Sequence, residues 1–295
     1  MDFLKKYDYA PDSESMNRIL ERIAANLENF ASEQVYKECF GMMDLTTLKT
    51  EDTPASVAKL VGKVNDFKEA YPRWPLPASV CVYPNFAAVA AAERKCDFNI
   101  TVVSACFPSS QSFLEVKLKE CELAVEQGAD EVDIVLALSR FLTEDYKGAA
   151  GEISQVRACI DRVAAAQGRK VYLKVILETG LLKTPENIAK ASFLAMEAGA
   201  DFIKTSTGKV DVNATPAAAY VMCECIARYH EVTGKKVGFK PAGGISSAAD
   251  MLCYYSIVST ILGKEWLGKN LFRFGVSRVA NNLLSTVEQK TVSFF

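Results

Sequence analysis

The sequence predicts a (β/α)8 barrel, in which parallel strands alternate with helices. Two observations support this fold class: eight short apolar runs rich in Val and Ile recur along the chain, and amphipathic helical stretches fill the gaps between them. The 295 residues also suit a barrel of roughly 250 residues with an extension. An open, doubly wound sheet is the alternative, but the chain lacks the G-x-G-x-x-G turn of nucleotide-binding members of that class.

A helical extension comes first. Behind the cap candidates Asp12 and Ser13, one apolar stripe at helical spacing comprises Met16, Ile19, Leu20, Ile23, Leu27 and Phe30. We expect this helix to pack on the barrel or on a neighbouring subunit. The chain is therefore predicted to divide into a helical extension, residues 1–38, and a barrel domain, residues 39–295, that ends in a short tail.

The barrel elements follow in order. Strands are expected at 41–48, 78–84, 99–107, 131–138, 171–178, 201–207, 236–243 and 272–277. Helices are expected in the gaps, for example at 56–70, 111–127, 186–199 and 215–229.

Composition limits the partners and the compartment. With 49% hydrophobic and 24% charged side chains, the chain can bury a large core, so it is not disordered. A net charge of −2 offers no basic field for nucleic acid and no polybasic run for lipid. No apolar run reaches the roughly 18 residues of a membrane span, and the first residues lack the apolar region of a signal peptide. We expect small-molecule partners, a cytoplasmic location and a homo-oligomer, a dimer.

The nine cysteines could form disulfides, but their number is odd and none makes a C-x-x-C pair. Free thiols in a reducing compartment are therefore expected. The only histidine, His230, lies in a polar stretch. A zinc site made by the protein would have too few ligands, and no metal is expected.

A short motif that occurs twice in the chain indicates candidate catalytic residues. GADEVD (128–133) and GADFIK (199–204) place Asp133 and Lys204 at equivalent positions of the fourth and sixth strands. Even-numbered strands contribute to the same layers of a barrel interior, so these two side chains should face one another. Lys174 and Lys240 occur in similar apolar settings.

These three lysines could instead extend outward between helices. Lysine is seldom buried without a partner, however, so three such positions favour a Schiff-base site. Burial and a second ammonium nearby can lower an amine pKa of about 10.4 enough to make the amine a nucleophile toward carbonyl carbon.

The segment TSTGK (205–209) is not a nucleotide P-loop. The Walker A pattern requires Gly where this chain has Ile203, and Ser or Thr where it has Val210. Barrels often bind phosphate on the loops after strands seven and eight. Here those loops offer Gly243 and Gly244, and Ser277, a candidate helix cap, beside Arg278.

Six motifs in order, MDLTTL, GADEVD, LKVILETG, GADFIKTSTGK, VNATP and GFKPAGGI, resemble those of the deoxyribose-phosphate aldolases, class I aldolases with the TIM-barrel fold. The similarity runs from about residue 41 to about residue 280. It implies an imine on Lys204, a second lysine, Lys240, that lowers its pKa, and a proton relay through Asp133, which Lys174 contacts. It also implies a phosphate site at Gly208, Lys209, Gly243, Gly244 and Ser277, with Arg278 where the family often has a second serine.

The resemblance implies reversible cleavage of 2-deoxy-D-ribose 5-phosphate into D-glyceraldehyde 3-phosphate and acetaldehyde, a step of deoxyribonucleotide and carbohydrate catabolism that needs no cofactor. Several members end in a mobile tail whose tyrosine assists proton transfer, whereas this chain ends in Phe294 and Phe295. Here the tail is expected to be a hydrophobic lid or to have no part in the chemistry. Two alternatives stay open: another Schiff-base aldolase or transaldolase-like enzyme, and a silent barrel that binds a sugar phosphate.

Overall fold

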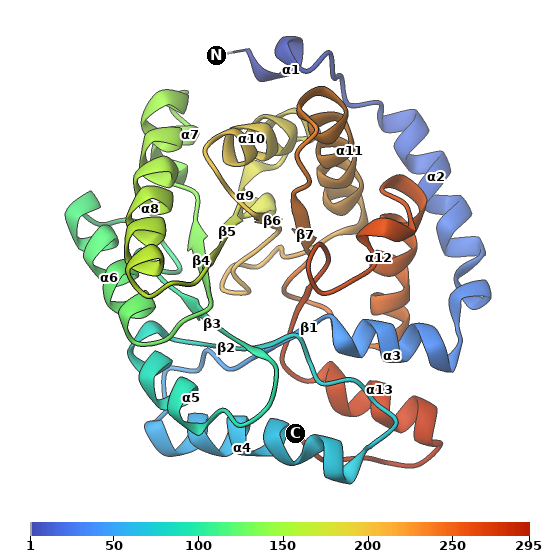
Figure 1. Ribbon diagram of the computed structural model, residues 1–295. Helices are drawn as coiled ribbons and strands as arrows, with labels where there is room; N and C mark the ends of the chain where they lie inside the picture. Colours follow the sequence, from blue (N-terminus) through green and yellow to red (C-terminus); the bar gives the residue numbers. More distant parts are fainter. Residues whose placement is uncertain (1) are drawn as a thin grey trace.

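The fold is a barrel of eight parallel strands surrounded by helices (Figure 1). The structure is a computed structural model that describes residues 2–295. The strands lie in the order β7-β6-β5-β4-β3-β2-β1-β8. Parallel bridges from Phe239 to Phe272 and from Ala242 to Gly275 join the two ends of that order. The predicted (β/α)8 barrel is confirmed, and the open doubly wound sheet is wrong because the strand order never reverses.

Each strand lies inside its expected range. The strands are β1 (Met43–Thr46), β2 (Ser79–Val82), β3 (Asn99–Val103), β4 (Glu131–Val135), β5 (Tyr172–Ile176), β6 (Phe202–Lys204), β7 (Gly238–Lys240) and β8 (Phe274–Val276).

Alternation along the strands separates an apolar layer from a polar barrel interior. On β4, Val132 and Ile134 pack in the hydrophobic core, whereas Glu131 and Asp133 contact charged groups of other strands. Successive side chains of a strand point to opposite faces. The main apolar core therefore lies between the strands and the helices, and the barrel interior is free to hold charged groups.

The outer layer consists of helices that follow the strands. They are α4 (Pro54–Ala70), α5 (Ala87–Glu93), α6 (Leu114–Glu126), α7 (Leu138–Phe141), α8 (Tyr146–Ala166), α9 (Thr179–Leu182), α10 (Pro185–Glu197), α11 (Pro216–Thr233), α12 (Ala248–Ile261) and α13 (Val279–Glu288), with the 3-10 turns η2 (Pro84–Phe86) and η3 (Lys264–Trp266).

Three of these helices begin with the same dipeptide. Thr53, Thr184 and Thr215 each accept a backbone N–H of the first turn, and a proline follows each at the first helical position. The hydroxyl satisfies an otherwise unpaired donor, and the ring of proline presets the helical φ. The sequence thus fixes where α4, α10 and α11 start.

The N-terminal segment forms α1 (Phe3–Lys6), α2 (Ser13–Ala25), η1 (Leu27–Phe30) and α3 (Glu33–Gly41). Asp12 caps α2, as expected, and Met16 and Ile23 are buried. The helix packs against α11 and α12 on the outside of the barrel (Figure 1). The division of the chain at residue 38 stays a prediction, because α3 runs across that position.

The C-terminal tail turns back after α13. Phe294 and Phe295 pack against Phe67 of α4, with ring centroids 5.5 and 5.4 Å away, and Phe295 also lies near Phe40. Their backbone N–H groups donate to the Oδ1 atom of Asn281. The tail therefore belongs to the outer apolar layer beside α4 (Figure 1).

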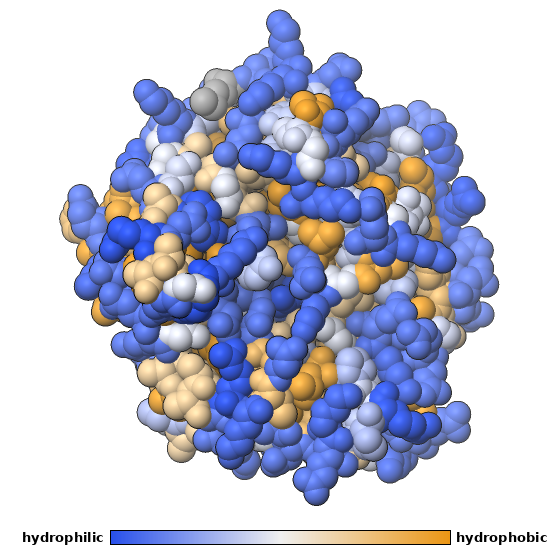
Figure 2. All heavy atoms as spheres, viewed as in Figure 1, coloured by the Kyte–Doolittle hydropathy of each residue, from blue (hydrophilic) through white to orange (hydrophobic). Residues whose placement is uncertain are grey.

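The surface is mostly polar in the view of Figure 2, where hydrophilic side chains dominate and apolar ones lie among them in small groups. Across residues 2–295, the helices are too short or too polar to cross a bilayer. The nine cysteines are all free thiols in the structure.

Candidate active site

Three lysines from three strands meet at one aspartate inside the barrel. The Nζ atoms of Lys204 and Lys240 both lie 2.8 Å from Oδ2 of Asp133, and the Nζ atom of Lys174 lies 2.9 Å from its Oδ1. The motif shared by the fourth and sixth strands therefore correctly predicted the contact between Asp133 and Lys204. The outward path for these lysines is wrong, because their side chains are at most 6% exposed.

Local sequence explains why the lysines point inward. Ile203 precedes Lys204, Phe239 precedes Lys240, and Leu173 precedes Lys174; these three apolar residues are buried in the hydrophobic core. A residue next to one that faces the helices must face the barrel axis, because strand side chains alternate.

Two further acidic residues contact the lysines around Asp133. Asp44 of β1 contacts Lys240 at 2.5 Å and Lys174 at 3.6 Å. Glu131 of β4 is the closest ionic partner of Lys174. Both side chains are fully buried, so each needs the cations around it.

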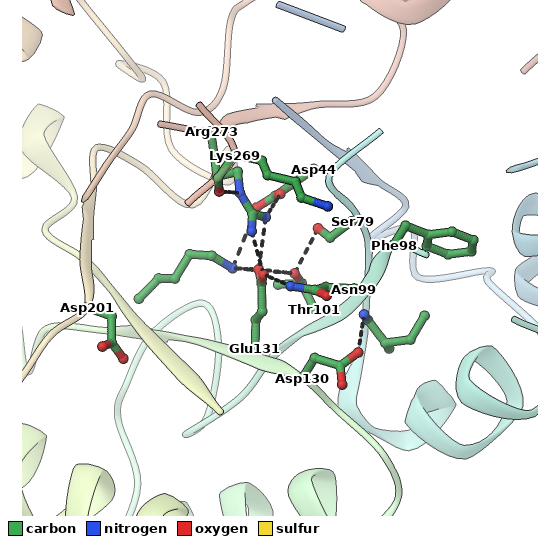
Figure 3. A network of polar contacts seen from close by, with 12 residues as sticks. Asp44, Ser79, Phe98, Asn99, Thr101, Asp130, Glu131, Asp201, Lys269 and Arg273 are labelled. Atoms are coloured by element: carbon green, nitrogen blue, oxygen red, sulfur yellow. Dashed lines mark hydrogen bonds and ion pairs between the residues drawn. The ribbon is translucent and has the colours of Figure 1, made fainter. Parts of the chain in front are cut away.

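Arg273, just before β8, joins these two acids. Its Nη1 atom lies 2.6 Å from Oδ1 of Asp44, and its Nη2 atom lies 2.6 Å from Oε1 of Glu131. Figure 3 shows Glu131 at the centre of this network, with Arg273, Asn99 and Thr101 directed toward its carboxylate. Asn99 donates to that carboxylate at 2.6 Å, and Thr101 donates at 2.8 Å.

Three members of the cluster, Asp44, Glu131 and Arg273, were not predicted from the sequence, although it carries a signal for each. Glu131 is two residues before Asp133, so the two share a face of the strand. Arg273 lies between Phe272 and Phe274, a charge in an apolar strand like the one that drew attention to the lysines. Asp44 is the one charged residue of GMMDLTTL.

Burial and neighbouring charge act together on Lys204. Burial lowers the pKa of its ammonium below the ordinary lysine value, and Lys240 lowers it further, while Asp133 opposes both. Lys204 is also the least deeply buried of the three lysines, with a side chain that is 6% exposed.

The other members of the cluster are held in their charged forms. Burial disfavours the ammonium of Lys240, but Asp133 and Asp44 outweigh it and raise the Lys240 pKa. The pKa of Lys174 is raised in the same way by Asp133 and Glu131. Burial would raise the pKa of Asp133, yet the three lysines beside it bring that pKa well below the usual range.

The residues predicted to hold phosphate lie on the loops after β6, β7 and β8. Gly208 and Gly244 are exposed, Gly243 is half-buried, and all three have positive φ, at 80°, 77° and 80° respectively. A Cβ atom on Gly243 would come within 2.6 Å of Oδ1 of Asn213. Glycine is required there by both conformation and space.

The polar side chains of these loops are exposed. Lys209 donates its Nζ atom to the backbone oxygen of Leu48 at 2.6 Å. Ser277 and Arg278 are both exposed. The expectation that Ser277 caps the following helix is wrong: Arg278 occupies the cap position of α13, and its side chain makes no cap hydrogen bond. No side-chain cap therefore accepts a hydrogen bond from the first backbone N–H groups of α13.

Comparison with known proteins settles the family. Residues 40–254 match the family described as DeoC/LacD family aldolase. The chain belongs to this family.

Curated relatives agree with the family assignment, and a solved structure shares the fold. The chain is 42% identical to the deoxyribose-phosphate aldolase of Homo sapiens over 260 residues, which cover 84% of this chain and 78% of the relative. It is 41% identical to the Bos taurus enzyme over the same shares. A tetrameric deoxyribose phosphate aldolase from Aeropyrum pernix has the same fold, with a TM-score of 0.65 at 22% identity, over 94% of this chain and 98% of that one.

Proposed function

We propose that this chain catalyses the reversible aldol cleavage of 2-deoxy-D-ribose 5-phosphate to D-glyceraldehyde 3-phosphate and acetaldehyde. The observation that carries the proposal is the buried amine of Lys204, whose Nζ atom shares one oxygen of Asp133 with a second amine, that of Lys240. Membership of the aldolase family and the names of the curated relatives support the substrate.

The reaction begins with the Lys204 amine. Its lone pair adds to the C1 aldehyde of the open-chain sugar, and loss of water gives a protonated imine. The lowered pKa of Lys204 supports this role, because only the neutral amine has a lone pair to donate. The positive imine nitrogen then serves as the electron sink.

Bond cleavage follows from the position of that sink. Removal of the proton from the 3-hydroxyl sends the C2–C3 bonding electrons toward the imine, so D-glyceraldehyde 3-phosphate departs and an enamine of acetaldehyde remains. Protonation of the enamine at C2 and hydrolysis of the imine release acetaldehyde and restore the Lys204 amine.

Asp133 and its lysines are proposed to carry the protons. A carboxylate with a strongly lowered pKa is a weak base on its own, so Asp133 is better suited to hold a water and orient Lys174 and Lys240 around it. Lys240, whose pKa is raised, stays an ammonium near neutral pH and supplies the charge that acts on Lys204.

The phosphate is proposed to lie against the loops after β6, β7 and β8. Gly208, Gly243 and Gly244 leave backbone N–H groups open to close approach, and Lys209 and Arg278 add positive charge. The loop after β8 leads directly into the N-terminus of α13, which no side chain caps and whose helix dipole favours an anion.

Turnover of candidate donors tests the proposal. The purified protein should convert 2-deoxy-D-ribose 5-phosphate to acetaldehyde and triose phosphate and should be inactivated by borohydride in the presence of acetaldehyde. Inactivation with a ketone donor such as dihydroxyacetone or pyruvate, but not with acetaldehyde, would instead favour another Schiff-base aldolase. No inactivation with any donor would favour the silent sugar-phosphate-binding barrel.

We also propose a cytoplasmic homodimer. The free thiols of all nine cysteines suit a reducing compartment. A structure with the same fold, from Aeropyrum pernix, is described as tetrameric, so the fold is compatible with self-association. Light scattering on the eluting peak of a sizing column would separate dimer from monomer and tetramer.

A further inference from the structure

The ionisable groups inside the barrel form one closed cluster with unequal numbers of acids and bases. Every side chain in it is at most 6% exposed. Its potential cations are Lys174, Lys204, Lys240 and Arg273, and its carboxylates are Asp44, Glu131 and Asp133.

Four cations facing three carboxylates leave one positive charge without a partner. Burying an unpaired charge is costly, and the usual response is a change of protonation. A guanidinium does not lose its proton in proteins. Arg273 therefore keeps its charge, and the proton must leave one of the three lysines.

Geometry selects which lysine loses it. Lys174 contacts three carboxylates, those of Asp44, Glu131 and Asp133. Lys240 contacts two of them. Lys204 contacts only Asp133, at an oxygen that it shares with Lys240. Lys204 has the weakest hold on its proton.

We propose that Arg273 is a positioning residue that supplies the surplus positive charge of the cluster and so keeps the Lys204 amine neutral and nucleophilic. It engages both oxygens of Glu131, at 2.6 and 3.1 Å, and one oxygen of Asp44. Figure 3 shows Arg273 directed toward these two acids. This inference rests on the function proposed above and adds how the nucleophile is prepared.

The other groups around Lys204 do not alter the count. Burial raises the pKa of the Cys81 thiol on β2, so this residue stays neutral. Glu178, which follows β5, is buried and accepts hydrogen bonds from the backbone and hydroxyl of Thr207. Lys209 is exposed and donates to Leu48. Among the described residues, neither Glu178 nor Lys209 forms an ion pair with the cluster.

The directions of the lysine pKa shifts agree with this assignment. Only Lys204 has a lowered pKa, whereas the pKa values of Lys174 and Lys240 are raised by their carboxylates. The Arg273 guanidinium, between Asp44 and Glu131, has its pKa raised as well, despite burial.

Competitive labelling of amines with acetic anhydride across a pH series, read by peptide mapping, measures the neutral fraction of Lys204 without any need for turnover. Arg273→Gln leaves three lysines facing three carboxylates. Its labelling midpoint at Lys204 should rise by about one pH unit or more. Arg273→Lys keeps the charge and should keep the midpoint of the parent protein. Arg157→Gln is the matched control, because Arg157 pairs with Asp201 outside the cluster, and its midpoint should not move.

The double variant Arg273→Gln with Glu131→Gln separates charge from structure. Three lysines then face two carboxylates, the surplus returns, and the midpoint should return to that of the parent. If Arg273→Gln does not fold, the double variant is compared with Glu131→Gln alone, in which four cations face two carboxylates. The Lys204 midpoint of Glu131→Gln should then lie below that of the double variant, and equal midpoints would overturn the proposal. A midpoint that is unchanged in Arg273→Gln, or that stays high in the double variant, would overturn the proposal. Borohydride trapping with acetaldehyde on the parent protein separately tests the function: no adduct there would refute the aldolase reaction, whatever the labelling shows.

Discussion

The barrel interior and the loops at the carboxyl ends of its strands differ in how far their polar groups are already paired. Inside the barrel, the Nζ atoms of three lysines lie within 2.9 Å of the carboxylate oxygens of Asp133. On the loops, Gly208, Gly244, Ser277 and Arg278 are exposed. A paired interior is preorganised for chemistry. Exposed loop donors are available to a ligand, so reaction and recognition should respond separately to mutation.

Lys204→Ala should give the largest effect, because it removes the only group proposed to bond to the substrate. Turnover of 2-deoxy-D-ribose 5-phosphate should fall by more than about a thousandfold, as measured by release of acetaldehyde. Lys236→Ala is the matched control, since that lysine pairs with Glu265 on the surface. Substantial turnover by Lys204→Ala would show that another amine forms the imine.

Lys240→Leu should keep the fold and slow imine formation by about a hundredfold at neutral pH. Two changes act in the same direction: Lys204 loses a neighbouring positive charge, and Asp133 is left to stabilise the Lys204 ammonium. The pKa of Lys204 therefore rises, and the pH–rate profile moves to higher pH. Lys117→Leu removes another buried lysine, one paired with Glu152 outside the cluster, and should leave the profile in place. An unmoved profile in Lys240→Leu would argue against the paired lysines.

How far the sequence could predict this molecule depends on the range of each signal. Alternation of apolar runs marked all eight strands. The motif shared by GADEVD and GADFIK placed Asp133 opposite Lys204, because each copy is a short local stretch that fixes the position of its charged residue in the strand. Asp44 lies on β1 and Arg273 just before β8, two strands that pair with each other although they come from opposite ends of the chain. Their pairing across 229 positions depends on that long-range strand contact, so the charge count of the cluster could not be made from the sequence.

The helix cap proposed for Ser277 failed for a local reason. Ser277 precedes the residue at the cap position, so its hydroxyl is one residue too early to accept from the first turn of α13. Serine favours a helix cap in general, but the register of a short loop decides which residue occupies that position.

Arg278→Ser tests the loops without touching the interior. A charge-assisted contact from an exposed guanidinium is expected to contribute about 1.5 kcal/mol, so KM for the phosphorylated sugar should rise about tenfold. The slow reaction of unphosphorylated deoxyribose should stay almost unchanged. Equal losses with both sugars would place Arg278 outside the phosphate site.

Deletion of the last five residues, 291–295, should have the smallest effect on chemistry. Phe294 and Phe295 carry no exchangeable side-chain proton, and they pack against Phe67 and Tyr71 rather than the lysine cluster. Deuterium incorporation into acetaldehyde in heavy water should stay within about threefold of the intact protein, against the roughly hundredfold loss typical of a missing general acid. A hundredfold drop would mean that the tail positions a proton donor.

The most direct test of the central claim is to find the residue that bonds to substrate. The protein is incubated with acetaldehyde, reduced with borohydride, digested with trypsin and mapped by mass spectrometry. The two-carbon adduct should appear on Lys204, because among the three clustered lysines it has the lowered pKa and the largest exposed fraction, 6% of its side chain. An adduct on Lys174 or Lys240 instead would contradict the account.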